Sequence, residues 1–128
     1  MPKVVIRSDK APAPVAAYSQ AIRAGDFLFL SGQIPIDPQT NEQVSGGIEA
    51  ETRRVLENLS AVLEAGGATL ADVVKVTAYL ADMQDFAAFN AVYVSYFPEQ
   101  PPARATVAVL GLPRGVRVEI DAVALLAR

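Results

Sequence analysis

The longest regular pattern in this sequence is an amphipathic segment from Ile48 to Ala65, with a glycine pair on either side. Gly66-Gly67 after the segment marks the point where a helix stops. A helix of this length buries its apolar stripe against another layer of the fold, so the rest of the chain must supply an apolar surface. The apolar positions follow the spacing of one helical face: Ile48, Val55, Leu56, Leu59, Val62 and Leu63.

Short apolar or alternating runs surround this helix and are typical of strands. A second helix is expected from Asp82, which can cap it, to about Phe97, where Pro98 ends it. The predicted order is β-β-β-α-β-α-β-β. It favours an α+β two-layer fold in which two helices cover one face of a mixed β-sheet, with residues 1–128 as one domain. The predicted strands cover residues 4–6, 18–23, 27–34, 73–81, 104–110 and 116–126.

Alternation along the strands predicts which residues share a face of the sheet. Three patterns follow. The last strand directs Val118, Ile120 and Ala122 to one side and Arg117, Glu119 and Asp121 to the other. On the strand before it, we expect Arg104 and Thr106 to share the second, mixed face with Ala108 and Leu110. That face is either solvated or buried against other subunits, and its many apolar positions favour an oligomer. On 73–81 the expected apolar set is Val74, Val76, Ala78 and Leu80.

The absent residue types restrict the chemistry. The chain has no cysteine and no histidine, which excludes disulfides, thiolate nucleophiles and Ser-His-Asp catalysis. Catalysis would depend on carboxylates, tyrosine, lysine, arginine, hydroxyls, backbone groups or water.

Charge and hydropathy bear on partners and location. The net charge is −3, and the eleven basic residues are spread along the chain, so no nucleic-acid partner is expected. No apolar run approaches the roughly 20 residues of a membrane span, and the N-terminus does not resemble a signal peptide. A cytoplasmic location without membrane contact is the expectation.

Arg104 and Glu119 are the first candidates for a functional site. Arg104 follows the stiff segment Gln100-Pro101-Pro102-Ala103, and its guanidinium could receive a small carboxylate through two hydrogen bonds. The alternative is a surface arginine or a structural ion pair. Glu119 lies in a strongly apolar strand, where burial could raise its pKa for acid–base work, but a solvated face is equally compatible with its neighbours.

The remaining candidates are weaker individually. Asn90 falls within the aromatic stripe of the second helix, where a carboxamide either stabilises the fold or lines a pocket. Tyr18 can cover a small pocket and still offer a hydroxyl. Gly32, within Ser31-Gly32-Gln33, indicates either close backbone approach by a ligand or a bulge.

Together these segments resemble the RidA/YjgF family of imine deaminases across nearly the whole chain. The matching stretches are Ala17-Tyr18-Ser19-Gln20-Ala21, Ser31-Gly32-Gln33-Ile34-Pro35, the helix 86–97 with Asn90, Pro102-Ala103-Arg104-Ala105-Thr106-Val107, Leu112-Pro113, and Val118-Glu119-Ile120.

The resemblance implies a chorismate-mutase-like fold and a homotrimer with clefts between subunits. It implies hydrolysis of 2-imino acids such as 2-iminopropanoate and 2-iminobutanoate, with no cofactor or metal. Arg104 would bind the substrate carboxylate and Glu119 would orient water, while Tyr18, Ser31, Gly32, Asn90 and Thr106 would line the cleft.

Two departures from the family pattern affect the expected rate and substrate preference. Ala16-Ala17 stands where relatives have Gly-Pro, and Thr106 stands where many have cysteine. Two other functions remain open. A trimeric metabolite-binding or regulatory protein would use the same cleft with little turnover. A ribonuclease or translation inhibitor is disfavoured by the acidic chain and by the absence of histidine.

Overall fold

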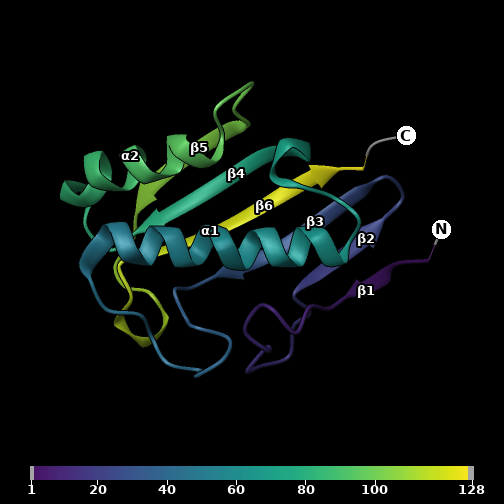
Figure 1. The fold of residues 1–128 in the computed structure, drawn as a ribbon, viewed down its shortest axis with the longest axis horizontal. Coiled ribbons are helices and arrows are strands. Elements are labelled where there is room, and N and C mark those ends of the chain that lie inside the picture. The colour runs from purple at the N-terminus through teal and green to yellow at the C-terminus, as the bar shows by residue number, and fades with distance from the viewer. Residues whose placement is uncertain (1, 127–128) are drawn as a thin grey trace.

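The computed structural model describes residues 2–126, and two helices lie across one face of a sheet (Figure 1). The predicted order β-β-β-α-β-α-β-β and the α+β two-layer architecture are confirmed. Short 3-10 turns lie at Leu70–Asp72, Met83–Asp85 and Pro113–Gly115. The strands are β1 (Val4–Ile6), β2 (Ala21–Ala24), β3 (Phe27–Gln33), β4 (Val73–Leu80), β5 (Ala103–Ala108) and β6 (Val118–Leu125), and the helices are α1 (Gly47–Ala65) and α2 (Phe86–Tyr96).

The six strands form one mixed sheet in the order β1-β2-β3-β6-β4-β5. Strand β6 is antiparallel to both β3 and β4, whereas β4 and β5 are parallel. A parallel pair needs a crossover connection, and α2 supplies it between β4 and β5. The C-terminal strand is therefore central, and β5 lies at an edge.

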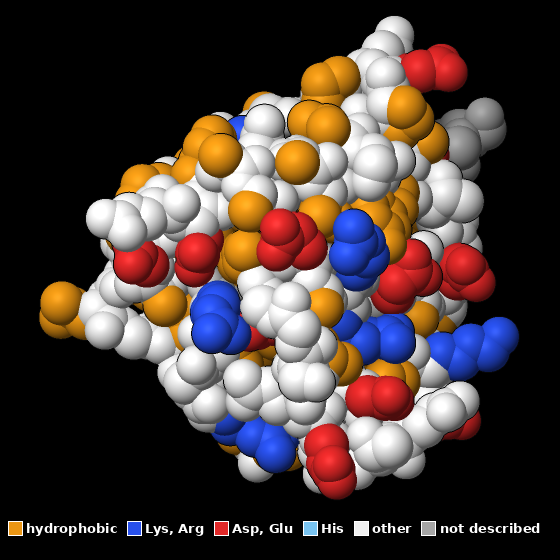
Figure 2. Space-filling view, turned by 60° about the vertical axis from the view of Figure 1, so that its left-hand side comes forward, with side chains coloured by type: hydrophobic (Ala, Val, Ile, Leu, Met, Phe, Trp, Pro, Cys, Tyr) orange, Lys and Arg blue, Asp and Glu red, His pale blue; other side chains and the backbone are white. Residues whose placement is uncertain are grey.

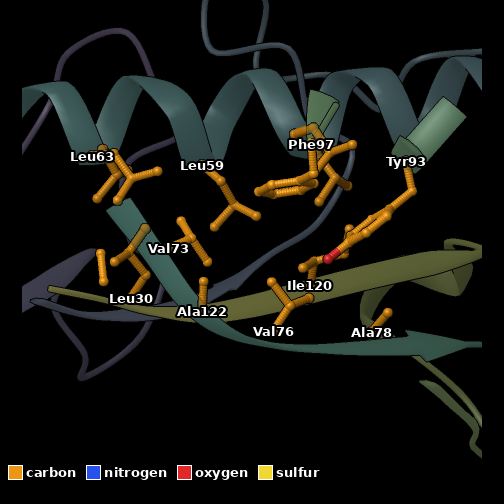
Figure 3. Packing of buried hydrophobic residues seen from close by; sticks show 14 of the residues in the cluster. Leu30, Leu59, Leu63, Val73, Val76, Ala78, Tyr93, Phe97, Ile120 and Ala122 are labelled. Atoms are coloured by element: carbon orange, nitrogen blue, oxygen red, sulfur yellow. The ribbon is translucent and has the colours of Figure 1, made fainter. Parts of the chain in front are cut away.

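The core lies between the sheet and the two helices. Leu59 and Leu63 of α1 and Tyr93 and Phe97 around α2 point toward the strands (Figure 3). Burial of this apolar surface is the main favourable contribution to folding. The expected alternation of β6 is confirmed, because its core-facing side chains are buried and Glu119 and Asp121 between them are only partly covered; the buried set is Val118, Ile120, Ala122 and Ala124.

Arg117 lies just before β6 and does not share the face of Glu119, contrary to our expectation. Its backbone N–H and its guanidinium both donate to Glu51 of α1, at 2.8 and 2.7 Å. Glu51 is only 1% exposed, so this pair satisfies a buried carboxylate and ties α1 to the start of β6. The sequence pattern predicted the wrong face because Arg117 lies before β6 begins at Val118. Side chains alternate between faces only where the strand is paired with its neighbours.

The apolar face predicted for β4 is correct from Val76 to Leu80 but wrong at Val74. The register with β6 shifts between Val73 and Lys75. An extra residue of this kind reverses the direction of the side chains before it. Val73 is therefore buried, and Val74 is 41% exposed.

The predicted face of Arg104 and Thr106 is also wrong. In the parallel pairing Arg104 lies opposite Val76, and Thr106 lies opposite Ala78. Both β4 residues are buried beneath the helices, so Arg104 and Thr106 point toward α2 and not toward the uncovered face. Alternation within β5 shows that the two residues share a face, but the pairing with β4 decides which face it is.

Acidic and basic side chains are intermixed across the face drawn in Figure 2, with no continuous basic stripe on it. A stripe of that kind would be needed to follow a phosphate backbone. Within residues 2–126, no helix has both the length and the apolar character required to cross a membrane.

A candidate active site in two halves

The first half of the site is a cavity of about 380 Å³ beside the end of β3. Tyr18, Ser31, Gly32 and Glu119 all line it, so residues from three separate segments of the sequence come together as predicted. Much of the remaining wall is apolar, from Pro12 to Ala16 and from the segment after β3. Concave, largely apolar spaces with a few polar groups are typical of small-molecule sites.

Gly32 is needed because of the position of Glu119. A Cβ atom at residue 32 would lie 2.1 Å from Oε2 of Glu119 and 2.9 Å from its Cδ. The absence of a side chain therefore gives the carboxylate its place against the β3 backbone. Of the two interpretations of Gly32, the structure bears out the bulge, because the register of β3 with β6 shifts between Leu30 and Gln33. The group that lies against its backbone is a carboxylate of the same chain.

Burial raises the pKa of Glu119 above its ordinary value of 4.5, and the negative charge of Asp121 adds to the increase. Within residues 2–126, no basic side chain lies within ion-pair distance of Glu119. A carboxyl group in this environment binds a proton more readily than an exposed one. Such a group can accept a proton from water and release it again.

The loop that carries Tyr18 is fixed by Gln20 and Ser31. The Gln20 side chain is 2% exposed; its Oε1 accepts from the Ser8 N–H at 2.6 Å, and its Nε2 donates to the Pro12 carbonyl at 2.8 Å. Ser31 Oγ donates to the Ser19 carbonyl at 2.6 Å. The expected strand at 18–23 therefore begins only at Ala21, and Tyr18 belongs to a braced loop.

The second half of the site surrounds Arg104. Its Nη1 donates to Oδ1 of Asn90 at 2.8 Å, and its Cζ lies 4.6 Å from the centre of the Tyr93 ring. Thr106 is two residues along on the same face of β5, and its hydroxyl is buried without a hydrogen-bond partner among the described residues. Asn90, Arg104 and Thr106 thus form one cluster, with an arginine that has no carboxylate partner within residues 2–126.

The two halves lie on opposite sides of the same sheet. Glu119 is on the face away from the helices, whereas Arg104 contacts α2. One copy of the chain therefore does not bring its own arginine and glutamate together across the sheet. Among the described residues, no group of three or more acidic, cysteine or histidine side chains could hold a metal ion.

Sequence reasoning gave no role to Arg114, which lines the cavity, or to Gln20, which braces the loop of Tyr18. Arg114 has a left-handed backbone with φ of 59°, which is uncommon outside glycine. The Pro113-Arg114-Gly115 turn was visible as a loop signal, and Gln20 stood inside a quoted motif. Neither pattern says that Arg114 meets a cavity or that Gln20 holds a loop.

Comparison with known proteins shows which family the chain belongs to. The family model described as "Endoribonuclease L-PSP" matches residues 8–126. A RutC family protein of Pyrococcus horikoshii is 57% identical over 122 residues, covering 95% of this chain and 97% of that protein. The chain belongs to the RidA/YjgF family.

Two further relatives are a protein with a named activity and a protein with a solved structure. The Mus musculus protein named 2-iminobutanoate/2-iminopropanoate deaminase is 45% identical over 121 residues, covering 94% of this chain and 90% of that protein. The crystal structure of RidA from the Antarctic bacterium Psychrobacter superposes with a TM-score of 0.93 at 44% identity, covering 96% of this chain and 99% of that one. The match extends over the whole fold, so every segment of both half-sites lies within the shared architecture.

Glu119→Gln tests the environment of the carboxylate. The folded-state pKa of Glu119 is raised, so the wild type loses stability relative to the variant as pH rises from 4.5 through that folded pKa. The variant is therefore expected to be more stable at neutral pH and equally stable at lower pH. Urea unfolding across the pH range, at fixed protein concentration, measures the difference.

Glu64→Gln on the exposed side of α1 is the matched control, and its stability difference should not vary with pH in this way. A Glu119→Gln difference that stays constant across the range would contradict the buried, unpaired carboxylate.

Proposed function

We propose that this protein hydrolyses 2-imino acids, such as 2-iminopropanoate and 2-iminobutanoate, to 2-keto acids and ammonia in a cleft formed between two copies of the chain. The observation that carries the proposal is the pair of uncompensated groups on opposite sheet faces. Arg104 has no acidic partner and Glu119 has no basic partner within residues 2–126. A ligand with a carboxylate next to an electrophilic carbon complements both.

Arg104 would bind the substrate carboxylate. One nitrogen of the guanidinium is occupied by Asn90, which leaves other N–H groups for two parallel hydrogen bonds to carboxylate oxygens. Fixing the substrate in this way removes much of the entropic cost of bringing it to the attacking water.

Glu119 would act on the water. With the imine protonated on nitrogen, its carboxylate takes one proton from water as the water oxygen bonds to the C=N carbon, and the C=N electron pair moves to nitrogen to give a neutral amine and a hydroxyl on a tetrahedral carbon. The Glu119 proton then passes to that nitrogen. The C–N bond breaks and ammonia leaves as the C=O forms, and the hydroxyl proton returns to Glu119, which releases it to solvent. Water supplies the oxygen, so the reaction needs no redox partner or covalent nucleophile.

The copies would assemble as a homotrimer through the uncovered sheet face. Phe27 and Phe29 of β3, Leu125 of β6 and Val107 of β5 are each more than 40% exposed on one chain. Apolar exposure on this scale across a sheet is typical of a buried subunit contact. Such packing would bring the Glu119 cavity of one copy beside the Arg104 cluster of the next.

A metabolite-binding protein with little turnover would use the same groups, and only Glu119 separates the two functions. A glutamate with a raised pKa and no partner has no evident use in holding an anionic ligand, because its ionised form repels a carboxylate. Ribonuclease activity, which the family description names, has less support in this chain, which contains no histidine.

Arg104→Ala tests the role of the arginine in turnover. An amino-acid oxidase would generate the imine, semicarbazide would trap what remains, and the loss of the semicarbazone would be followed. The wild type should reduce trapping, and Arg104→Ala should lose about a hundredfold or more in kcat/KM because the substrate anion then has no cationic partner.

Arg104→Lys is the matched control for charge, and it should remain well below wild type because an ammonium does not form two parallel bonds. A folded Arg104→Ala that retains wild-type turnover would contradict the proposal.

Mixing two inactive variants tests the shared cleft. Arg104→Ala and Glu119→Gln, mixed in equal amounts and allowed to exchange subunits, should recover about a quarter of wild-type activity. The reason is that each half of a cleft has one chance in two of being intact. If the mixture stays as inactive as its components after exchange is verified, the cleft does not draw its two halves from different copies.

Gly32→Ala tests the placement of Glu119 without removing it. The new Cβ would displace a flexible carboxylate and not backbone, so kcat/KM should fall about tenfold to a hundredfold while the unfolding temperature changes little. Gly111→Ala is the control, since a Cβ there meets no atom within 4 Å. Equal activity of the two variants would show that the carboxylate position is unimportant.

A further inference from the structure

Three aromatic rings of α2 surround the Arg104 guanidinium. Its Cζ lies 4.6 Å from the centre of the Tyr93 ring, 5.5 Å from that of Phe86 and 5.6 Å from that of Phe89. Spacings of three and four residues place these rings on one side of a helix. We refer to Phe86, Phe89 and Tyr93 as the aromatic cage.

The cage is itself held firmly. Phe89 is fully buried and Tyr93 is 3% exposed, and their ring centres are 5.5 Å apart at a tilt of 42°. Phe86 packs against Phe89 with ring centres 6.2 Å apart. The hydroxyl end of Tyr93 points down into the core between α2 and the sheet (Figure 3). Rings that are packed in this way cannot follow a moving guanidinium, so they restrict where it lies.

The cage also replaces the acid partner that a partly buried arginine would ordinarily have. An aromatic face carries negative electrostatic potential and attracts a cation placed over it. A carboxylate of the chain would stabilise the charge as well, but it would occupy the N–H groups along the edge of the guanidinium. The three ring centres lie within 6 Å of its Cζ and bring no carboxylate, and Asn90 accepts from Nη1 alone.

We propose that the aromatic cage positions Arg104, with Tyr93 as its main member: the rings confine the guanidinium without supplying a carboxylate, and the N–H groups that Asn90 does not use stay open for the substrate carboxylate. The identity of that carboxylate rests on the function proposed above. The positioning itself rests on the ring distances.

The Tyr93 hydroxyl allows the ring and the oxygen to be tested separately. This hydroxyl is buried and has no hydrogen-bond partner among the described residues. Burial raises the pKa of Tyr93 and the nearby Arg104 guanidinium opposes the increase; the net pKa is raised, so the hydroxyl stays protonated. Tyr93→Phe therefore removes an unpaired polar group but keeps the ring, whereas Tyr93→Leu removes the ring.

The experiment compares Tyr93→Phe, Tyr93→Leu and Phe86→Leu with the wild type. Tyr96→Leu is the matched control, because it removes a ring from the same helix that does not contact Arg104. The readouts are kcat and KM for imine hydrolysis and the Kd of 2-oxobutanoate, a carboxylate that does not react. Tyr93→Leu and Phe86→Leu should raise KM and Kd about fivefold to tenfold and change kcat less. Tyr93→Phe and Tyr96→Leu should stay near wild type.

A spectroscopic readout keeps this test independent of turnover. The Nε–H resonance of Arg104, assigned by its loss in Arg104→Lys, should be displaced by the ring currents of the cage. The displacement should persist in Tyr93→Phe and shrink in Tyr93→Leu. If the wild type hydrolyses no imine, the proposed function fails, while the resonance and the affinity for 2-oxobutanoate still decide the positioning.

Two results would overturn the proposal. One is a folded Tyr93→Leu with the KM, Kd and Arg104 resonance of the wild type. The other is a Tyr93→Phe as impaired as Tyr93→Leu, which would assign the effect to the hydroxyl and not the ring. If Tyr93→Leu does not fold, Phe86→Leu decides, because Phe86 is only partly buried and its loss is better tolerated.

Discussion

Strand β6 lies between β3 and β4, and its strict alternation decides which side of the sheet each functional side chain occupies. Val118 and Ile120 are fully buried beneath the helices. Glu119, which stands between them, must therefore face the other way, where Gly32 leaves room for its carboxylate. The same sheet carries Arg104 on the helix side, through the pairing of β5 with β4. The two half-sites are separated because the sheet that carries them has the hydrophobic core on one of its faces.

The division has an electrostatic consequence. An arginine and a glutamate on one face would pair, and each would then satisfy the other's charge. Glu119 and Arg104 lie on opposite faces and do not pair. Partial burial raises the pKa of Glu119, and Arg104 is stabilised by aromatic rings and one amide oxygen. Both groups stay available to a ligand. Such perturbed, unpartnered groups are more frequent at functional sites than elsewhere in folded proteins.

The sequence was sufficient to predict the order of elements, the extent of α1 and the face of Glu119, because each follows from a local period. It was insufficient wherever a residue's direction depends on a neighbouring strand. Arg104 was assigned to the wrong face because the register with β4 is a tertiary property. Val74 was misassigned because a one-residue shift leaves no mark in the apolar pattern. The family resemblance predicted candidate site residues and clefts between subunits, but the motifs did not indicate that Glu119 and Arg104 lie on opposite faces of one sheet.

The measurement that tests the two-copy site most directly is a crystal structure of the protein with 2-oxobutanoate bound. The account predicts its carboxylate on the free edge of Arg104 of one copy and its carbonyl carbon directed toward Glu119 of a neighbouring copy. A ligand held within the cavity of a single copy, with no contact to any Arg104, would contradict it.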